Sequence, residues 1–225
     1  MDLEDLRAVS YTATQPQVLL SYRAGLFPMG VGAGGTGRMG WWAPRQRGVL
    51  LPGDLHVTKS LRKSMKHFAF SSDCAFERVI RACGDPSRPG AWITEEIISL
   101  YLGLHSDGWA HSVEVWAGDE LVGGLYGVAI GSFFAGESMF HTRRDASKAA
   151  LAHLVGLLDN AVAADERGRT DSRTAAPEAG EWLIDTQWQT SHLKSLGVSE
   201  ISGLEYSARL DSALRGSLCQ DILNK

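Results

Sequence analysis

Residues 109–140 constrain the fold more than any other part of the chain. Apolar and polar residues alternate over residues 112–116, which is the period of a half-buried strand. After a turn at residues 117–120, residues 121–130 are almost wholly apolar, as is typical of a strand buried on both faces. Gly131 then turns the chain into a third short strand. We therefore expect an antiparallel meander of three strands.

A carboxylate, Glu137, stands at the end of this expected meander. A buried charge is costly unless it is paired, so Glu137 needs partners. Rigid strands would hold such a group as part of a functional site. The alternative is a structural carboxylate that pairs with a backbone amide or an arginine.

Composition sets the class of protein. The chain has 225 residues and is 44% hydrophobic, enough for one large or two small globular domains. No apolar run approaches the roughly 18–20 residues that span a membrane, and the acidic start does not resemble a signal peptide. Cys74, Cys83 and Cys219 are irregularly spaced, which favours reduced thiols and a cytoplasmic location. No histidine has the spacing of a metal ligand, so we expect neither a metal nor a cofactor.

One local basic patch stands out in a chain whose formal net charge is −4. Lys59, Arg62, Lys63 and Lys66 would share one face of a helix capped by Thr58. Four cations in a row repel one another, and the phosphates of a nucleic acid could neutralise them. An ordinary solvated helix face is the alternative.

The chain is expected to divide into a small N-terminal module, residues 1–55, and an α/β (α+β) domain, residues 56–225. Residues 30–40 contain six glycines and formally match a dinucleotide-binding fingerprint. No strand precedes this match and no helix can follow it, so we expect a mobile loop and no NAD. Residues 164–181 are polar and are expected to form a flexible insertion. Helices are expected at residues 16–23, 58–66, 76–82, 94–105, 146–162 and 191–196, and a further strand at residues 182–188.

Two polar residues share one face of that last strand. Asp185 and Gln187 are two positions apart, so their side chains leave the same side, while Ile184 and Thr186 face the other. Because the strand is otherwise apolar, a polar face needs a reason. A simple hydrogen-bonded pair near a strand end is the alternative to a reaction centre.

Several segments together resemble the leucyl/phenylalanyl-tRNA–protein transferases, over roughly residues 20–215. They are His-Ser-Val-Glu-Val-Trp (111–116), Leu-Val-Gly-Gly-Leu-Tyr-Gly-Val (121–128), Gly-Glu-Ser-Met-Phe (136–140), Tyr-Arg-Ala-Gly-Leu-Phe-Pro (22–28), Trp-Trp-Ala-Pro-Arg (41–45), Trp-Ile-Thr (92–94), Asp-Ala-Ser-Lys (145–148), Ile-Asp-Thr-Gln (184–187) and His-Leu-Lys-Ser-Leu-Gly (192–197). The resemblance implies an acyl-CoA N-acyltransferase-like (GNAT-like) domain with a mixed, largely antiparallel sheet.

The resemblance also implies an activity: moving Leu, Phe or Met from aminoacyl-tRNA to the N-terminal Arg or Lys of acceptor proteins, which marks them for degradation. We expect such a protein to act in the cytoplasm as a monomer, without a membrane, metal or cofactor. Asp185 and Gln187 would be catalytic. Asp185 would attract the acceptor's cationic N-terminus and assist its deprotonation, either directly or through Gln187. Gln187 could equally position the ester carbonyl.

Other residues take substrate-binding roles by the same resemblance. The aminoacyl-adenosine end would contact Glu137, Trp92, Tyr101, Trp41, Trp42 and Tyr22. The apolar side chain would enter a pocket formed by Leu125, Phe134, Met139, Leu151 and Leu154. The tRNA phosphates would contact Lys59, Arg62, Lys63 and Lys66. Taken singly, each aromatic or aliphatic residue is equally consistent with core packing.

Three departures from the family pattern and two competing functions remain. Met29 replaces a frequent tryptophan, so one expected adenine contact is either missing or supplied by Trp41 or Trp42. The N-terminal stretch is short and lacks a Gly-Gly-Asp-Leu segment, and residues 164–181 lengthen the connection to the catalytic strand. An acetyl-CoA-dependent N-acetyltransferase would need a glycine-containing phosphate loop at a helix start, which residues 143–148 lack. A non-catalytic RNA-binding module would need the basic helix alone.

Overall fold

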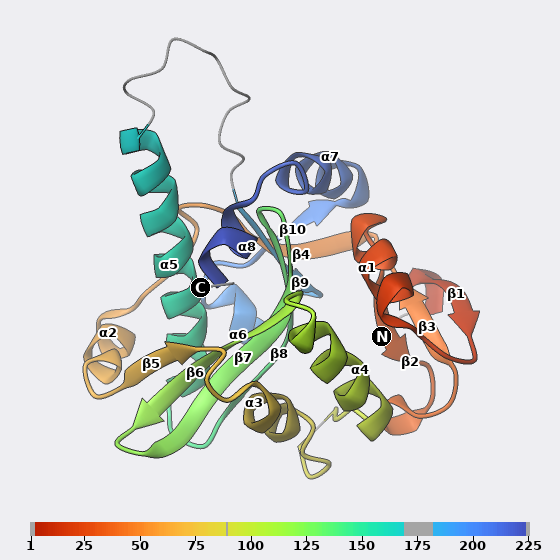
Figure 1. The fold of residues 1–225 in the computed structure, drawn as a ribbon, viewed down its shortest axis with the longest axis horizontal. Helices are drawn as coiled ribbons and strands as arrows, with labels where there is room; N and C mark the ends of the chain where they lie inside the picture. Colours follow the sequence, from red (N-terminus) through yellow and green to blue (C-terminus); the bar gives the residue numbers. More distant parts are fainter. Residues whose placement is uncertain (1–2, 89, 169–181, 224–225) are drawn as a thin grey trace.

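The computed structural model describes residues 3–88, 90–168 and 182–223, which form two sheets with helices around them (Figure 1). The smaller sheet is N-terminal, has the strand order β1–β3–β2 and is antiparallel throughout. Its segment comprises η1 (Leu3–Asp5), β1 (Leu6–Ser10), α1 (Gln15–Arg23), β2 (Phe27–Gly30), η2 (Ala33–Gly35) and β3 (Met39–Trp42). Helix α1 begins after Thr14, which forms a capping box with Gln17, as the helix expected at Pro16 requires.

The glycine-rich segment forms the β2–β3 hairpin, so the expectation of a mobile loop over residues 30–40 is wrong at both ends. Gly30 is the last residue of β2 and Gly40 lies within β3. Gly35 has φ of +74°, and a Cβ at this position would lie 1.9 Å from the carbonyl oxygen of Trp92. Glycine is needed here because the backbone of the hairpin touches the backbone at Trp92.

The larger sheet has seven strands in the order β10–β4–β9–β8–β7–β6–β5. Its strands are β4 (Gln46–Leu50), β5 (Ala69–Ser72), β6 (Ala110–Ala117), β7 (Glu120–Ile130), β8 (Phe133–His141), β9 (Leu183–Gln187) and β10 (Ser199–Ser202). The expected three-stranded meander is confirmed as β6–β7–β8. The strand expected at residues 182–188 is confirmed as β9.

Strands β8 and β9 are parallel, unlike the other strand pairs in the described part of the chain. Their pairing runs only from Phe133, opposite Leu183, to Ala135, opposite Asp185. Beyond this point β8 continues against β7 and β9 continues against β4. The two strands therefore separate in the middle of the sheet, and this opening determines where a site can form.

Helices cover both faces of the larger sheet (Figure 1). On one face α3 (Phe76–Cys83) and α4 (Glu95–Ser106) contact the meander, and on the other α5 (Ala146–Gly168) and α8 (Leu218–Leu223) do so. The short helices α2 (Lys59–Met65) and α6 (Ser191–Lys194) lie on the α5 side, and α7 (Gly203–Ala213) contacts β4, β9 and β10. Each face has its own cluster of buried apolar side chains, as a two-sided sheet requires.

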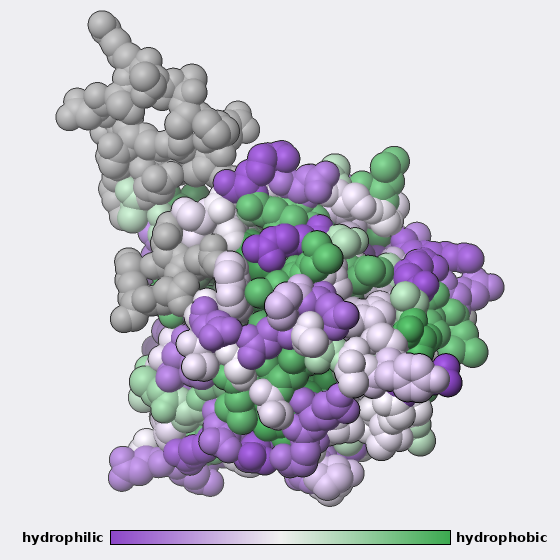
Figure 2. All heavy atoms as spheres, turned by 45° about the vertical axis from the view of Figure 1, so that its right-hand side comes forward, coloured by the Kyte–Doolittle hydropathy of each residue, from purple (hydrophilic) through white to green (hydrophobic). Residues whose placement is uncertain are grey.

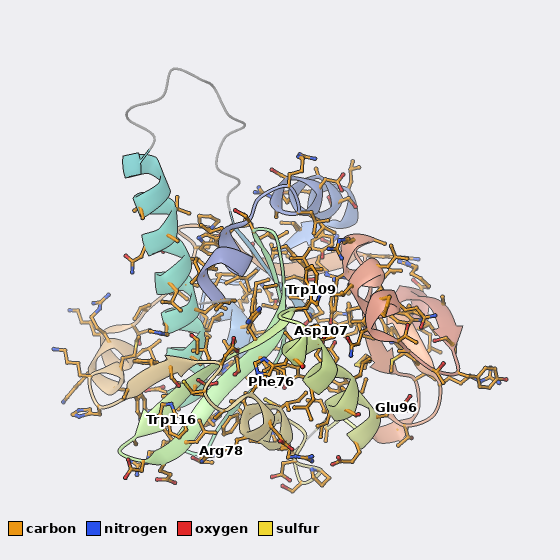
Figure 3. All side chains as sticks on the ribbon, viewed as in Figure 1. Phe76, Arg78, Glu96, Asp107, Trp109 and Trp116 are labelled. Carbon is orange, nitrogen blue, oxygen red and sulfur yellow. The ribbon has the colours of Figure 1, made fainter. Side chains whose placement is uncertain are left out.

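The N-terminal segment joins the larger sheet through aromatic contacts. The guanidinium of Arg23 on α1 lies 5.4 Å from the ring of Trp109, which precedes β6 (Figure 3). A similar pair, Arg78 and Trp116, lies at the far end of β6.

Figure 2 turns the N-terminal side forward and shows apolar residues scattered among hydrophilic ones, as on ordinary protein surfaces.

The mixed α/β class expected from the sequence is confirmed. The division at residue 55 stays a prediction, and β4 bears on it, because this strand precedes residue 55 yet belongs to the larger sheet. Helix α5 runs to Gly168 and so enters the expected insertion, while residues 169–181 lie outside the described residues. Among the helices that the structure describes, none combines the length and apolar character needed to cross a membrane.

Candidate active site

A buried ion pair lies where β4 and β9 pair in the larger sheet. Arg47 Nε donates to Asp185 Oδ1 at 2.9 Å and Nη2 donates to Oδ2 at 2.6 Å, with side chains only 1% and 0% exposed. Tyr206 Oη on α7 donates to Oδ2 at 2.9 Å, and the backbone N of Gln187 donates to Oδ1 at 2.8 Å. Four donors thus surround one carboxylate, as a buried charge requires.

This environment limits what Asp185 can do. Its two oxygens already accept from three residues, and the side chain is closed to solvent. Asp185 also holds the backbone N of Gln187. In this arrangement neither of its carboxylate oxygens is exposed at a surface that an amine could reach.

Sequence reasoning did not find Arg47 or Tyr206. A single cation at the start of a strand usually faces solvent, and a tyrosine on an amphipathic helix resembles a core residue. One signal was available. Asp185 stands in an apolar strand, and a buried carboxylate requires a cation, but the sequence does not say which of its arginines supplies it.

A chain of hydrogen bonds leads from Gln187 away from the ion pair. Gln187 Nε2 donates to Glu137 Oε1 at 3.3 Å, and Tyr101 Oη donates to Glu137 Oε2 at 3.1 Å. The hydroxyl oxygens of Tyr101 and Tyr22 are 2.5 Å apart. Both tyrosines are buried, and burial raises the pKa of each well above its usual value. They therefore stay neutral hydrogen-bond donors.

Burial also raises the pKa of Glu137 to about 8. Hydrogen bonds from Tyr22 and Tyr101 act in the opposite direction, the negative charge of Asp185 adds to the rise, and Arg47 opposes it. The loss of hydration is the largest of these effects, because burial disfavours the charged form of a carboxyl group. Glu137 is therefore mostly protonated at neutral pH.

We expect this raised pKa to appear in the pH dependence of stability. Glu137 binds a proton more tightly in the folded chain than in the unfolded one, so its stabilisation is complete below about pH 4.5 and is lost as the pH rises to about 8. The free energy of unfolding of the wild type, measured in urea, should fall relative to Glu137→Gln over this range and level off above it.

The control is Glu96→Gln, because Glu96 is an exposed carboxylate on α4 (Figure 3). Its pH profile should run parallel to that of the wild type. If the free energy of unfolding of the wild type also runs parallel to that of Glu137→Gln from about pH 5 to about pH 8, the raised pKa of Glu137 is contradicted by the same linkage relation.

A cavity of about 230 Å³ lies at the opening between β8 and β9. Its apolar lining consists of Leu125, Phe134, Met139, Leu151, Ile184 and Leu193, and its polar lining includes Glu137, Ser138, Thr186, Gln187, Thr190 and His192. An apolar cavity of about 150 Å³ can hold a benzene ring. This cavity is therefore large enough for the side chain of leucine or phenylalanine.

The structure brings most of the residues proposed for the apolar pocket into this one cavity. Leu125, Phe134, Met139 and Leu151 line it, whereas Leu154 is fully buried in the same apolar cluster but does not reach the cavity. The residues of α6 and the preceding turn were not singled out from the sequence. The one signal in the sequence was that segment 192–197 resembles the family. Nothing local indicated that this helix closes the cavity, because the rest of the cavity is formed by distant parts of the chain.

The aromatic residues proposed for the adenosine lie in different surroundings. Tyr22 and Tyr101 are bound to each other beside Glu137. Trp42 donates to the carbonyl oxygen of Met29 and Trp41 donates to Ser10 Oγ, so both indoles are bound within the smaller sheet. Trp92 is half-buried and is the most exposed of the five.

The basic residues lie on α2, and the helix is confirmed. Thr58 caps it by accepting a hydrogen bond from the backbone N of Leu61. The four cations of the stripe, Lys59, Arg62, Lys63 and Lys66, are all exposed. Within residues 3–88, 90–168 and 182–223, none of them forms an ion pair. The contact of this stripe with tRNA stays a prediction.

The cavity and its polar edge define a class of site. An apolar cavity bordered by hydrogen-bonding groups suits an apolar side chain and presents the polar group attached to it. Among the described residues, no three His, Cys, Asp or Glu side chains are grouped so as to hold a metal ion. The fold and the cavity together define a mixed α/β protein with a candidate binding site for a ligand that carries an apolar side chain.

Comparison with known proteins identifies the family. Residues 49–165 match the family model described as leucyl/phenylalanyl-tRNA protein transferase. Curated proteins named leucyl/phenylalanyl-tRNA–protein transferase are similar over most of the chain. The protein from Paramagnetospirillum magneticum is 44% identical over 205 residues, covering 89% of each chain. Those from Afipia carboxidovorans and Rhodopseudomonas palustris are 40% and 41% identical, covering 89% and 90% of this chain and 82% of their own. The chain therefore belongs to the leucyl/phenylalanyl-tRNA–protein transferase family.

Proposed function

We propose that the protein transfers Leu, Phe or Met from aminoacyl-tRNA to the N-terminal Arg or Lys of acceptor proteins, which marks them for degradation. The observation that carries the proposal is the apolar cavity with Gln187 and Glu137 at its edge, in a chain of this family. We further propose that the protein acts in the cytoplasm, where charged tRNA is available. We also propose that it acts as a monomer.

The reaction converts an ester into an amide. The free α-amine of the acceptor attacks the ester carbonyl carbon, the carbon–oxygen bond to the tRNA ribose breaks, and the amine's proton passes to the ribose oxygen. This exchange is favourable, so the protein has to hold the two reactants together and stabilise the oxyanion. No cofactor is needed to balance these steps.

The residues at the cavity suit these tasks. The apolar lining would hold the transferred side chain, which fixes the ester carbonyl at the polar edge. The amide of Gln187 would then position that carbonyl or the incoming amine, and the ion pair of Asp185 and Arg47 would fix the backbone of Gln187. Glu137, neutral at pH 7 because of its raised pKa, would offer a hydrogen bond to the aminoacyl-adenosine end.

Trp92 is the best candidate for stacking on the terminal adenine, since its side chain is half-buried and aromatic side chains bind bases through their faces. Trp41 and Trp42, which we proposed as replacements for the tryptophan missing at Met29, are bound within the smaller sheet. The separating parallel strands β8 and β9 support a GNAT-like architecture, which stays part of this proposal.

A transfer assay tests the function. The protein is incubated with tRNA charged with labelled Leu and a peptide that begins with Arg, and label on the peptide's N-terminus is expected. A peptide that begins with Asp and a tRNA charged with Lys are the controls. The lysyl-tRNA should not react, because a lysine side chain cannot enter an apolar cavity without leaving a charge unpaired. The peptide that begins with Asp should not react, because the proposed acceptor carries an N-terminal Arg or Lys. Transfer from acetyl-CoA instead of from charged tRNA would contradict the proposal.

The basic stripe supports a second test, which concerns tRNA binding. We expect Arg62→Ala/Lys66→Ala to weaken tRNA binding and to reduce the slope of log affinity against log salt by about two, because two phosphate contacts are lost. The loss should not depend on the attached amino acid, since phosphates carry no side-chain identity. Transfer from an aminoacyl-adenosine, which lacks the distant phosphates, should be nearly unchanged.

The matched control is Arg81→Ala/Arg209→Ala. It removes the same charge from one exposed and one partly exposed helix position, where the arginines pair with Glu77, Glu95 and Glu205. This variant should keep the wild-type salt slope. An equal slope in wild type and Arg62→Ala/Lys66→Ala would mean that the stripe is an ordinary solvated face.

A further inference from the structure

Gln187 has an unusual backbone conformation. Its φ is +58°, in the left-handed region, which among the described residues other than glycine is shared only by Asp73 and Asp145. This conformation is unfavourable for any residue with a Cβ and persists where the surroundings hold it. The side chain of Gln187 reaches Glu137 and the cavity from this conformation.

One anchor lies on the N-terminal side of Gln187. Its backbone N donates to Asp185 Oδ1 at 2.8 Å, and Asp185 is fixed by the guanidinium of Arg47. This anchor fixes only the peptide unit that precedes Gln187. A second constraint is needed after it, because the following peptide unit also moves when the residue relaxes to an extended conformation.

The next residue, Trp188, is held by the N-terminal module. Its Nε1 donates to Asp5 Oδ2 at 3.1 Å. Its ring lies edge-on to Phe27 of β2, with ring centroids 5.0 Å apart, and 6.2 Å from the ring of Trp42 of β3. Such edge-on pairs are favourable contacts, so the indole is fixed on two strands of the smaller sheet.

Asp5 is itself fixed at the end of β3. Its side chain is buried, and its other carboxylate oxygen, Oδ1, accepts from the backbone N of Arg45 at 3.2 Å. Its carbonyl oxygen accepts from the backbone N of Ala43 at 2.8 Å. A carboxylate buried in this way with two donors is a strong and directional acceptor. The indole of Trp188 therefore meets a rigid partner.

We propose that Asp5 and Trp188 are positioning residues for the transfer reaction. Through their hydrogen bond the N-terminal module holds Gln187 in the left-handed conformation, with its side-chain amide turned toward Glu137 and the cavity. Without this bond the chain relaxes at Gln187, and the amide leaves the place where the ester carbonyl and the amine meet. The inference rests on the proposed function, in which Gln187 contacts the reacting groups.

The test measures kcat and KM for leucyl transfer in the full-length chain. Asp5→Ala removes the acceptor, and Trp188→Phe removes the donor while it keeps a ring against Phe27 and Trp42. We expect kcat to fall about tenfold or more in each variant, since a small misplacement of a reacting group is costly, and KM for charged tRNA to stay within about twofold of wild type. Asp5→Asn keeps one acceptor oxygen for Trp188 Nε1 but places its amide NH2 against the backbone N of Arg45, so it should restore kcat in part.

Two further variants separate positioning from a general effect on the fold. The double variant Asp5→Ala/Trp188→Phe should lose no more kcat than the worse single variant, because both break the same bond. Glu4→Ala is the matched control: it removes the neighbouring carboxylate, which is exposed and pairs with Arg45, and it should keep the wild-type kcat. Thermal unfolding of every variant shows whether the fold persists, and Trp188→Phe carries the test if Asp5→Ala does not fold.

The outcomes distinguish this inference from the proposed function. If Gln187→Gly transfers leucine at the wild-type rate, the proposed function of Gln187 is contradicted, and the positioning role falls with it. If Gln187→Gly loses transfer while Trp188→Phe and Asp5→Ala keep the wild-type kcat, only the positioning role is overturned. A rise of KM at constant kcat in Trp188→Phe also overturns it.

Discussion

Replacing Arg47 with methionine is expected to lower the free energy of unfolding by about 3–5 kcal/mol. The methionine would fill much of the same space, but Asp185 would be left as a buried carboxylate with only the hydroxyl of Tyr206 and the backbone N of Gln187 as donors. Such a charge must either become protonated or draw water into the sheet, and both are costly. Urea unfolding at pH 7 measures the loss directly.

The matched control is the double variant Arg47→Met/Asp185→Leu. A buried ion pair that is replaced as a whole by apolar side chains often costs little, so the double variant should be more stable than Arg47→Met alone. A loss below about 1 kcal/mol in Arg47→Met, which is the range of exposed ion pairs, would contradict the account of a buried and otherwise unpaired Asp185. Arg81→Ala, at an exposed ion pair, gives that reference value in the same protein.

Local signals in the sequence predicted local elements. Thr58 and Thr94 cap α2 and α4 by accepting from the backbone N three residues later, and these caps could be read directly because a helix start is decided within one turn. The meander β6–β7–β8 was predictable for a similar reason. Its strands follow one another in the chain, and its alternating and apolar runs have the length of strands.

Non-local pairing was not predictable. Strand β4 was missed because its five residues carry no period of their own and its partners, β9 and β10, come much later in the chain. Arg47 and Asp185 are 138 positions apart, and no local pattern near either residue indicates that the two pair. The same holds for the contact of Tyr101 with Tyr22, and for the closing of the cavity by α6. Here the sequence predicted which groups need partners, and the fold decides which partners they have.

The glycine-rich hairpin illustrates a different limit. Glycine allows both irregular loops and close backbone contacts, and the sequence does not distinguish these two uses. The contact that requires Gly35 is with Trp92, in a part of the chain that the local pattern does not include. A mobile loop was therefore the expectation from local sequence, although the glycines belong to an antiparallel hairpin.

The second large effect is expected from Gln187→Ala, which should lower kcat for leucyl transfer about 10²–10³-fold, the usual loss when a donor to the reacting carbonyl is removed. The side chain lies at the edge of the cavity and donates to Glu137. In the proposed mechanism the amide acts mainly when the tetrahedral intermediate forms, so KM for charged tRNA should change little. Single-turnover transfer measures the chemical step without product release.

The backbone of Gln187 requires a second variant, because alanine in the left-handed region carries a strain of its own. Gln187→Gly removes the same side chain and tolerates φ of +58° without strain, so it should lose as much kcat as Gln187→Ala while unfolding at a similar temperature to wild type. Gln189→Ala is the matched control, since Gln189 is a nearby glutamine that donates to the carbonyl oxygen of Val198 and does not line the cavity. It should keep the wild-type kcat.

Near-wild-type transfer by Gln187→Gly would remove the glutamine amide from the mechanism. Equal losses in the alanine and glycine variants would assign the effect to the amide itself, held at the cavity by a carboxylate on one side and a tryptophan on the other.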